Sequence, residues 1–347
     1  MANEKKAVET PVEYDPQYIL QVKDLKKYFP IKGGMISKTV GHVKAVDGVT
    51  FNLKRGTTMG LVGESGCGKT TTGRTILRLA GEKTGGQVLF NGKDVYALSD
   101  KEMRDMRTKM QIIFQDPFSS LQPRMPVGEI IGEAVREHGL VSKEEFDDYI
   151  DQVMDNCGLQ PFHKDRYPHE FSGGMRQRVM IAMGLICHPK LLIADEPTTA
   201  LDVTIQAQIL ELMNDLRHKL GMSIIMITHD LGVVAQMCEK IAVMYAGHIV
   251  EYGTTDEIFY NPQHEYTKGL INSIPKLNAE EKERLVPIEG QPVDLLNPPA
   301  GCPFAPRCKS CMKVCLNKMP PRTELSDTHY TYCWLRQKEE FEKGGKA

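Results

Sequence analysis

The chain has 347 residues, with 43 lysine and arginine residues against 45 aspartate and glutamate residues. This length suffices for one large domain and a smaller appendage, because a domain commonly holds about 100–200 residues. The balanced charge and the lack of a long basic run argue against a partner bound by phosphate neutralisation. We therefore expect no nucleic acid among the partners.

The sequence contains no segment that predicts export or membrane insertion. Residues 1–17 are polar and lack the apolar core of a signal peptide, and apolar runs such as 179–187 are far shorter than the roughly 20 residues of a membrane helix. Four of the nine cysteines are scattered before residue 263, as in a cytosolic protein with reduced thiols. The other five lie within 302–333.

Strand-like and helix-like patterns alternate from Tyr18 to about Pro262. This alternation predicts an α/β fold with a mostly parallel sheet covered by helices. The runs 58–63, 190–195 and 222–228 are short, apolar and rich in β-branched residues, as in strands buried on both faces. Each run ends at a polar motif, and ligands in such sheets bind at the carboxyl ends of the strands.

One part of this domain is dominated by helical patterns, which predict a helical subdomain at about 116–189. Apolar residues at helical spacing indicate helices over 127–138, 143–157, 173–187 and, beyond the subdomain, 203–220.

The composition changes after residue 262. Residues 287–306 hold six of the chain's 20 prolines, which favour extended loops over helix. We therefore predict two domains, 18–262 and a smaller one at 263–347 that contains the cysteine cluster.

The segment GESGCGKT follows the first predicted strand and has the spacing of a phosphate loop. Its glycines let the loop turn with its N–H groups inward, and the positive end of the next helix adds to this phosphate cradle. Lys69 should reach the β- and γ-phosphates of a nucleotide, and the Thr70 hydroxyl should bind Mg²⁺. Cys67 is interpreted as a small filling side chain rather than a nucleophile. The predicted nucleotide-binding residues of this loop are Gly63, Glu64, Ser65, Gly66, Cys67, Gly68, Lys69, Thr70 and Thr71.

Two further motifs lie downstream. FSGGMRQR opens a predicted helix at Ser172, Gly173 and Gly174, and LLIADEP ends a predicted strand at Asp195 and Glu196. Asp195 should hold the Mg²⁺, and Glu196 is placed to polarise an attacking water as general base. The order of phosphate loop, Ser-Gly-Gly helix start and Asp-Glu strand end resembles the ATP-binding-cassette (ABC) ATPases.

This resemblance implies roles for residues that would mean little alone. His229, after the third predicted strand, matches the switch histidine near the γ-phosphate, and Gln115 in IIFQDP matches the glutamine that touches the metal or the attacking water. Tyr28 in DLKKYFP matches the aromatic residue that stacks on adenine, with Phe29 as the alternative.

The resemblance also implies a dimer. A helix start in the helical subdomain cannot readily fold back onto the phosphate loop of its own chain, so two ATPase subunits pair head to tail in this family. Each Ser-Gly-Gly helix then caps the γ-phosphate held by the other subunit. Asp202, with Ala200 and Leu201 before it, matches the loop that crosses this interface.

Longer segments narrow the resemblance. FQDPFSSLQPRMPVGEII, FSGGMRQRVMIAM and DEPTTALDVTIQAQIL look like the ATPase subunits of bacterial oligopeptide and dipeptide importers, and so does GCPFAPRC in the tail. Such a subunit hydrolyses ATP on the cytoplasmic face of the membrane. Its expected partners are a sister ATPase, two transmembrane permease subunits and an extracytoplasmic binding protein.

Four cysteines of the tail, Cys302, Cys308, Cys315 and Cys333, are separated by five, six and seventeen residues, and Cys311 is an extra one. Thiolates gathered in a reducing compartment indicate a metal rather than disulfides, and four suit either Zn²⁺ or a [4Fe–4S] cluster. The resemblance to the peptide-importer ATPases favours the cluster, and unmetallated cysteines are the third possibility. We expect a structural role, because the cysteines lie far in sequence from every nucleotide motif.

Other functions fit parts of the pattern. ATPases of nickel and other small-solute importers are similar in sequence, and some ABC ATPases act without a membrane partner. The single nucleotide domain, the lack of a basic surface and the tail all favour transport. A scaffold that binds ATP without hydrolysis is opposed by Glu196 and His229.

Overall fold

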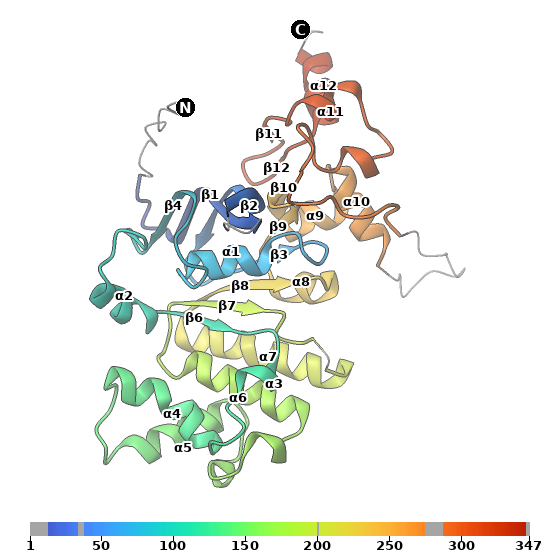
Figure 1. Cartoon of the computed structure of the whole chain (residues 1–347). Coiled ribbons are helices and arrows are strands. Elements are labelled where there is room, and N and C mark those ends of the chain that lie inside the picture. Colours follow the sequence, from blue (N-terminus) through green and yellow to red (C-terminus); the bar gives the residue numbers. More distant parts are fainter. Residues whose placement is uncertain (1–12, 34–37, 200, 275–286, 345–347) are drawn as a thin grey trace, which may run out of the picture.

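The computed structural model describes residues 13–33, 38–199, 201–274 and 287–344. Two sheets form the body. The helices between residues 127 and 185, called the helical group below, lie on one side of it, and the described residues from 263 onward, called the C-terminal extension, lie on the opposite side (Figure 1). The predicted α/β fold is confirmed.

The three apolar runs that predict buried strands are neighbours in the centre of the larger sheet. They form β3 (Thr58–Val62), β7 (Leu191–Asp195) and β8 (Ser223–Thr228), and β8 pairs in parallel with both of the others. Every residue of these strands is buried, as expected for β-branched runs covered on both faces.

The larger sheet has the strand order β11-β12-β10-β9-β3-β8-β7-β6, and the smaller one has the order β2-β1-β4-β5. In the larger sheet β9, β3, β8, β7 and β6 run parallel, whereas β10, β12 and β11 pair antiparallel. The other strands are β1 (Tyr18–Gly33), β2 (Lys38–Lys54), β4 (Gly85–Phe90), β5 (Lys93–Asp94), β6 (Met110–Ile113), β9 (Lys240–Tyr245), β10 (His248–Thr254), β11 (Thr323–Glu324) and β12 (Tyr330–Thr331).

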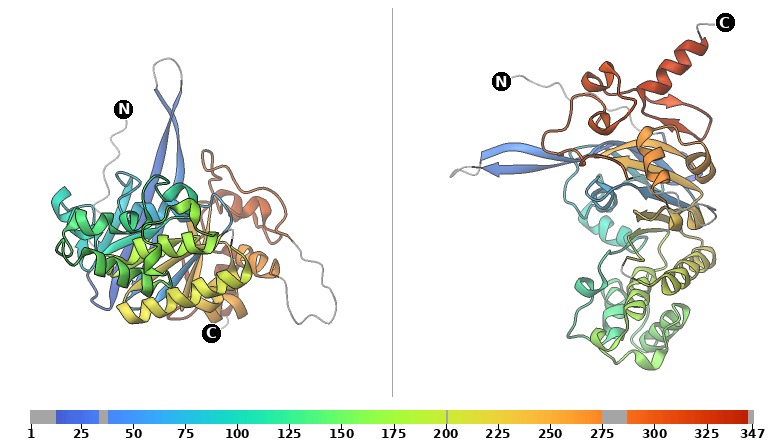
Figure 2. Two further views of the ribbon diagram at one scale, coloured as in Figure 1. Left: turned by 90° about the horizontal axis from the view of Figure 1, so that it is seen from below. Right: turned by 90° about the vertical axis from the view of Figure 1, so that its right-hand side faces the viewer.

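β1 and β2 form a long antiparallel hairpin, from the pair Tyr18 and Lys54 to the pair Gly33 and Lys38. Figure 2 shows its outer half as a blue two-stranded ribbon that projects from the body. Charged residues and glycines interrupt the apolar pattern of these strands, so sequence periodicity did not predict them.

The predicted helices are present. α4 (Val127–His138), α5 (Phe146–Asn156) and α6 (Gly173–Leu185) pack together below the sheet edge, and α7 (Val203–Leu220) ends at the left-handed Gly221 (Figure 1). The remaining α-helices are α1 (Lys69–Ile76), α2 (Asp100–Arg107), α3 (Pro117–Ser120), α8 (Leu231–Met237), α9 (Thr255–Tyr260), α10 (Glu265–Asn272), α11 (Lys313–Asn317) and α12 (Trp334–Gly344). Among the described helices none is long and apolar enough to span a membrane.

The C-terminal extension continues the larger sheet. β12 pairs with β10, where Tyr330 lies opposite Tyr252 and their rings stack with centroids 5.1 Å apart. Phe304 and Cys315 belong to the same buried apolar cluster as α4 and α6. The extension therefore shares its sheet and its core with the preceding residues, and the domain boundary near residue 263 stays a prediction.

Candidate nucleotide site

The predicted phosphate loop connects β3 to α1, and two of its glycines lie against other backbone segments. Gly63 has φ 150° and Gly68 has φ 107°. A Cβ atom would lie 2.2 Å from the Met244 carbonyl oxygen at Gly63, and 2.1 Å from that of Ala45 at Gly68. Only glycine therefore fits at these two positions without displacing β2 or β9.

The loop encloses a cavity of about 180 Å³. Lys69 lies at its base with its Nζ donating to the carbonyl oxygens of Gly63 at 2.7 Å and Glu64 at 3.0 Å. A glycine-rich loop, a lysine and a helix start make the cavity suited to phosphate. It is lined by Ala45, Ser65, Gly66, Gly68, Lys69, Thr70, Thr71, Gln115 and Glu196.

Gly63, Glu64 and Cys67 are not among the lining residues and support the loop from behind. Cys67 is 6% exposed, and burial raises the pKa of its thiol. A neutral, enclosed thiol matches the predicted filling role.

Thr70 and Asp195 meet at the carboxyl end of β7. The Thr70 hydroxyl donates to Asp195 Oδ1 at 2.9 Å, while Asp195 Oδ2 is buried without a hydrogen-bond partner. Burial raises the pKa of the Asp195 carboxyl. An unpaired buried carboxylate oxygen beside a hydroxyl is a donor set that fits Mg²⁺, a cation that prefers oxygen ligands.

Three polar side chains contact the carboxylate of Glu196. Its Oε2 accepts hydrogen bonds from Gln115 Nε2 at 2.7 Å and from the Thr199 hydroxyl at 3.0 Å, and its Oε1 lies 3.2 Å from His229 Nδ1. Glu196 has φ 49°, a left-handed conformation that is uncommon outside glycine and is concentrated at functional sites. The structure thus brings together the three residues predicted for hydrolysis and adds Thr199, which no sequence motif indicated.

The Ser-Gly-Gly motif starts α6 at a separate place. The Ser172 hydroxyl caps the helix by accepting from the Met175 N–H at 3.3 Å, and none of the three motif residues lines the phosphate cavity. Asp202 caps α7 in the same manner. Gly174 lies close to α7, because a Cβ there would be 2.7 Å from Ile205 Cγ2.

The interface role of these two motifs stays a prediction. Ala200, which precedes Asp202 in the predicted crossing loop, lies outside the described residues.

Tyr28 lies on β1 outside the cavity. Its hydroxyl donates to Asp47 Oδ1 at 2.6 Å, and burial together with this contact raises the pKa of the phenol. Phe29 does not line the cavity either, and it is 39% exposed. The adenine-stacking role of either residue stays a prediction.

The C-terminal extension touches the phosphate loop. Arg307 donates from Nη1 to Glu64 Oε2 at 2.6 Å and from Nη2 to Glu64 Oε1 at 2.9 Å. Sequence analysis did not predict this contact, and the structural role expected for the cysteines stays a prediction. No motif near either residue could have revealed the contact.

Four cysteines of the extension, Cys302, Cys308, Cys315 and Cys333, line one small cavity, whereas Cys311 is exposed. Burial raises the pKa of Cys302 to about 12 and that of Cys308 to about 11. Within the described ranges no group of three or more His, Cys, Asp or Glu side chains is arranged to hold a metal ion. The expected iron–sulfur cluster or zinc is therefore not supported by this arrangement.

Two family models match the chain. The model described as ABC transporter matches residues 46–199, and the model of the oligopeptide/dipeptide transporter C-terminal region matches residues 250–315. The first range includes the phosphate loop. The second includes most of β10, the strand that pairs with β12, and the first three cysteines of the cavity.

Curated proteins and solved structures resemble the chain over most of its length. The oligopeptide transport ATP-binding protein OppD of Bacillus subtilis is 51% identical and aligns over 91% of this chain and 88% of its own. The dipeptide transport ATP-binding protein DppD of the same organism is 49% identical, over 92% and 95%. The dimeric structure of the ATP-binding cassette MJ0796, bound to ADP and Pi, is similar with a TM-score of 0.60 and 27% identity, over 68% of this chain and 98% of that one.

Proposed function

The chain belongs to the ATP-binding subunits of ABC transporters for dipeptides and oligopeptides, and on this premise we propose how its residues divide the work of ATP hydrolysis. The subunit is an ATPase coupled to import, bound peripherally at the cytoplasmic face of the membrane. The proposal is supported by one observation: beside the phosphate cavity, Glu196 is contacted by Gln115, Thr199 and His229.

Glu196 is the general base that polarises the attacking water. Gln115 and Thr199 hold one carboxylate oxygen in place, so the other can face the water. His229 lies beside this second oxygen and is placed to contact the γ-phosphate as it separates. A base fixed by three partners loses little orientational freedom in the reaction, which favours the transition state.

ATP is the substrate of this site, and Mg²⁺ is its metal. Thr70 and Asp195 would hold the ion through the threonine hydroxyl and the unpaired Asp195 oxygen. Bound Mg²⁺ supplies positive charge to the β- and γ-phosphate oxygens. Lys69 needs only to leave the carbonyl oxygens of Gly63 and Glu64 to reach the same phosphates.

A second ATPase subunit completes each site. Ser172, Gly173 and Gly174 lie away from the cavity of their own chain, and the similar cassette MJ0796 is a dimer. The positive end of α6 would cap the γ-phosphate held by the partner, and Asp202 would lie at the same interface. We propose a sister subunit rather than a second copy of this chain, on the likeness to transporters that use two related ATPases.

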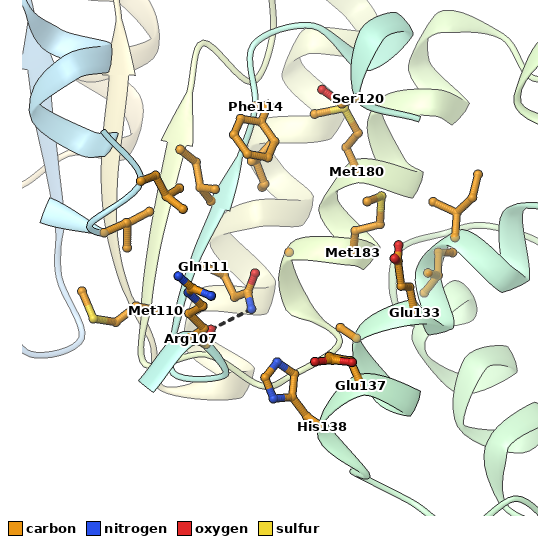
Figure 3. Close-up of a pocket in the computed structure, with 18 of the residues that line it drawn as sticks. Arg107, Met110, Gln111, Phe114, Ser120, Glu133, Glu137, His138, Met180 and Met183 are labelled. Atoms are coloured by element: carbon orange, nitrogen blue, oxygen red, sulfur yellow. Dashed lines mark hydrogen bonds between the residues drawn. The ribbon is translucent and has the colours of Figure 1, made fainter. Parts of the chain in front are cut away.

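The permease docks in the cleft between β6 and the helical group. This cleft has a volume of about 690 Å³ and is lined by apolar side chains such as Met110, Met180 and Met183, with Arg107 and Glu137 at its rim (Figure 3). An apolar floor with a charged rim suits a short amphipathic helix. The cleft ends near Phe114, next to Gln115, so a docked helix would be coupled to the catalytic group.

The remaining partners follow from the relatives. Two transmembrane permease subunits and an extracytoplasmic binding protein complete the importer, and the names of the relatives favour dipeptides or oligopeptides as cargo over nickel or other small solutes.

A metal in the extension is a further part of the proposal. Four cysteines converge on one cavity, and four thiolates are the usual donor set of a [4Fe–4S] cluster or of structural Zn²⁺. The described side chains would have to close around the metal.

The test is ATP hydrolysis by the assembled importer in membranes or nanodiscs. We expect basal hydrolysis that rises when peptide-loaded binding protein is added, and no rise with unloaded protein or with nickel. An equal response to a nickel-loaded binding protein would overturn the cargo assignment, and the absence of hydrolysis would overturn the ATPase itself.

A further inference from the structure

Arg307 places a buried guanidinium against the phosphate loop. Its side chain is 3% exposed, and it forms a two-pronged ion pair in which both Glu64 carboxylate oxygens accept, at 2.6 Å and 2.9 Å. Two parallel charge-assisted hydrogen bonds fix orientation as well as distance. The Arg307 side chain therefore links the extension to the loop at a fixed distance and orientation.

The other hydrogen bonds of this guanidinium hold it to the extension and to β9. Nε donates to the Glu289 carbonyl oxygen at 2.9 Å, Nη2 to that of Ile288 at 3.3 Å, and Nη1 to the Tyr245 hydroxyl at 3.4 Å. Ion pairing with Glu64 is the largest influence that raises the pKa of Arg307 above its ordinary value. With its donors satisfied, Arg307 cannot leave Glu64 for another partner without a cost in free energy.

The contact with Glu64 reaches the nucleotide site through the backbone of that residue. The Glu64 carbonyl oxygen accepts from Lys69 Nζ at 3.0 Å, and the Glu64 N–H donates to the Tyr266 hydroxyl at 2.8 Å. Tyr266 is fully buried on α10 and packs against Phe304 with ring centroids 5.4 Å apart. The carboxylate and the N–H of Glu64 are thus held by groups beyond residue 263, while its carbonyl group holds the phosphate-binding lysine.

The back of the loop is also covered by the extension. A small cavity is lined by Glu64, Ser65, Gly66 and Cys67 on one side, and the extension contributes Pro292, Val293 and Leu295 to its lining. The Leu295 carbonyl oxygen accepts from the Lys44 N–H at 3.1 Å, which ties this segment to β2 next to the glycine-lined cradle.

Charge gives the contact a second consequence. Glu64 belongs to the phosphate loop, although its side chain does not line the phosphate cavity, and an unpaired carboxylate in this loop would disfavour the polyanionic phosphates of ATP. Arg307 neutralises that carboxylate. Loss of the guanidinium would leave a partly buried, unpaired negative charge within the phosphate loop.

We propose that Arg307 is a positioning residue for ATP, through which the C-terminal extension sets the affinity of the phosphate loop. This inference rests on the proposed function, because it assumes that ATP binds at the loop. Arg307 holds Glu64 in place and cancels its charge. It does not touch the groups around Glu196, so ATP binding changes when Arg307 is lost, whereas the hydrolytic step does not.

The experiment measures ATP affinity and steady-state hydrolysis in the assembled importer. Arg307→Gln is expected to raise the Kd and the KM for ATP about tenfold, as for a lost hydrogen bond to a charged group, with kcat within about twofold of the parent. Arg307→Lys keeps the charge but not the two-pronged geometry, and a rise of about threefold is expected. This conservative variant keeps the test decisive where Arg307→Gln does not fold.

A double-mutant cycle separates this role from a loss of packing. In a Glu64→Gln background there is no carboxylate to neutralise, so the further change Arg307→Gln should raise the Kd by less than about twofold. Arg322→Gln, a change in an arginine that pairs with Glu324 inside the extension, is the matched control and should leave the Kd unchanged.

Two outcomes overturn the proposal: a parental Kd for Arg307→Gln, or an equal rise in the parent and Glu64→Gln backgrounds. Lys69→Ala distinguishes this failure from a failure of the proposed function. If ATP affinity survives Lys69→Ala, ATP does not bind at the loop. If affinity is lost with Lys69→Ala but survives Arg307→Gln, only the positioning role is wrong.

Discussion

Gln115 Nε2 donates a 2.7 Å hydrogen bond to Glu196 Oε2. Gln115 follows Phe114, which lines the cleft beside the helical group, and both Gln115 and Glu196 line the phosphate cavity. A displacement of the helical group would therefore move a partner of the proposed general base. If the permease docks in the cleft as proposed, this contact links the docked helix to the proposed general base.

Glu196→Gln should abolish most hydrolysis and preserve ATP binding. The amide keeps the size of the side chain but cannot accept a proton, so we expect kcat to fall by a factor of about 10²–10⁴. The Kd for ATP should stay close to the parent value, because the phosphate loop is unaltered. Hydrolysis and nucleotide binding by the assembled importer measure the two quantities. Glu211→Gln, at an exposed acid on α7, is the control, and parental turnover by Glu196→Gln would refute the assignment.

Asp195→Asn should stabilise the metal-free fold at neutral pH. Burial raises the pKa of Asp195 in the folded state, so the folded protein holds this proton more tightly than the unfolded chain does. Stability from the protonated form is complete only below the ordinary aspartate pKa of about 4 and is lost as the pH rises through the raised pKa. The variant lacks this loss, so its advantage in the free energy of unfolding should grow from pH 4 to pH 7.

Urea unfolding of metal-free protein at the two pH values measures this advantage. Asp215→Asn, at an exposed position on α7, should show no such trend. Magnesium with ADP should stabilise the parent and not Asp195→Asn. If the two proteins respond equally to magnesium, Asp195 is not a ligand.

The strands and the site motifs could be predicted because their signals are local. Apolar runs of β-branched residues mark β3, β7 and β8, and each is followed by a polar motif whose residues, from Lys69 to Glu196, meet at one edge of the sheet. Thr199 was missed because a threonine after Asp-Glu-Pro carries no distinctive spacing. The pair of Glu64 and Arg307 was missed for a different reason: charge complementarity between residues 243 positions apart leaves no pattern in a single sequence.

Met183→Asp should uncouple the subunit from the permease. Met183 lies on the floor of the cleft in Figure 3, where a carboxylate would oppose the insertion of an apolar helix face. We expect the variant to bind ATP like the parent but to be lost from the importer during affinity purification. Leu316→Asp, at an exposed leucine on α11, controls for the charge change. Normal recovery of Met183→Asp with the permease would show that the cleft is not the docking site.

The metal proposal predicts the content of anaerobically purified protein. A cluster held by Cys302, Cys308, Cys315 and Cys333 gives a brown protein with about four irons per chain. Serine at any of the four should lower the iron content and the thermal stability of the extension, whereas Cys311→Ser should change neither. One zinc and no iron would refute the cluster and retain the four-ligand geometry, and the absence of both metals would refute the site.

The ion pair between Arg307 and Glu64 also has a consequence for the order in which parts of the subunit fold during synthesis. Its two ends are separated by 243 residues, and ribosomes add about 5–20 residues per second, so about 10–50 s pass between the appearance of the loop and that of its support. A nascent chain therefore carries its ATP-binding loop long before the loop is held in place. If Arg307 sets the affinity as proposed, the newly synthesised subunit binds ATP weakly until the extension has folded. Hydrolysis that is not coupled to transport is then delayed until the folded subunit can bind its permease.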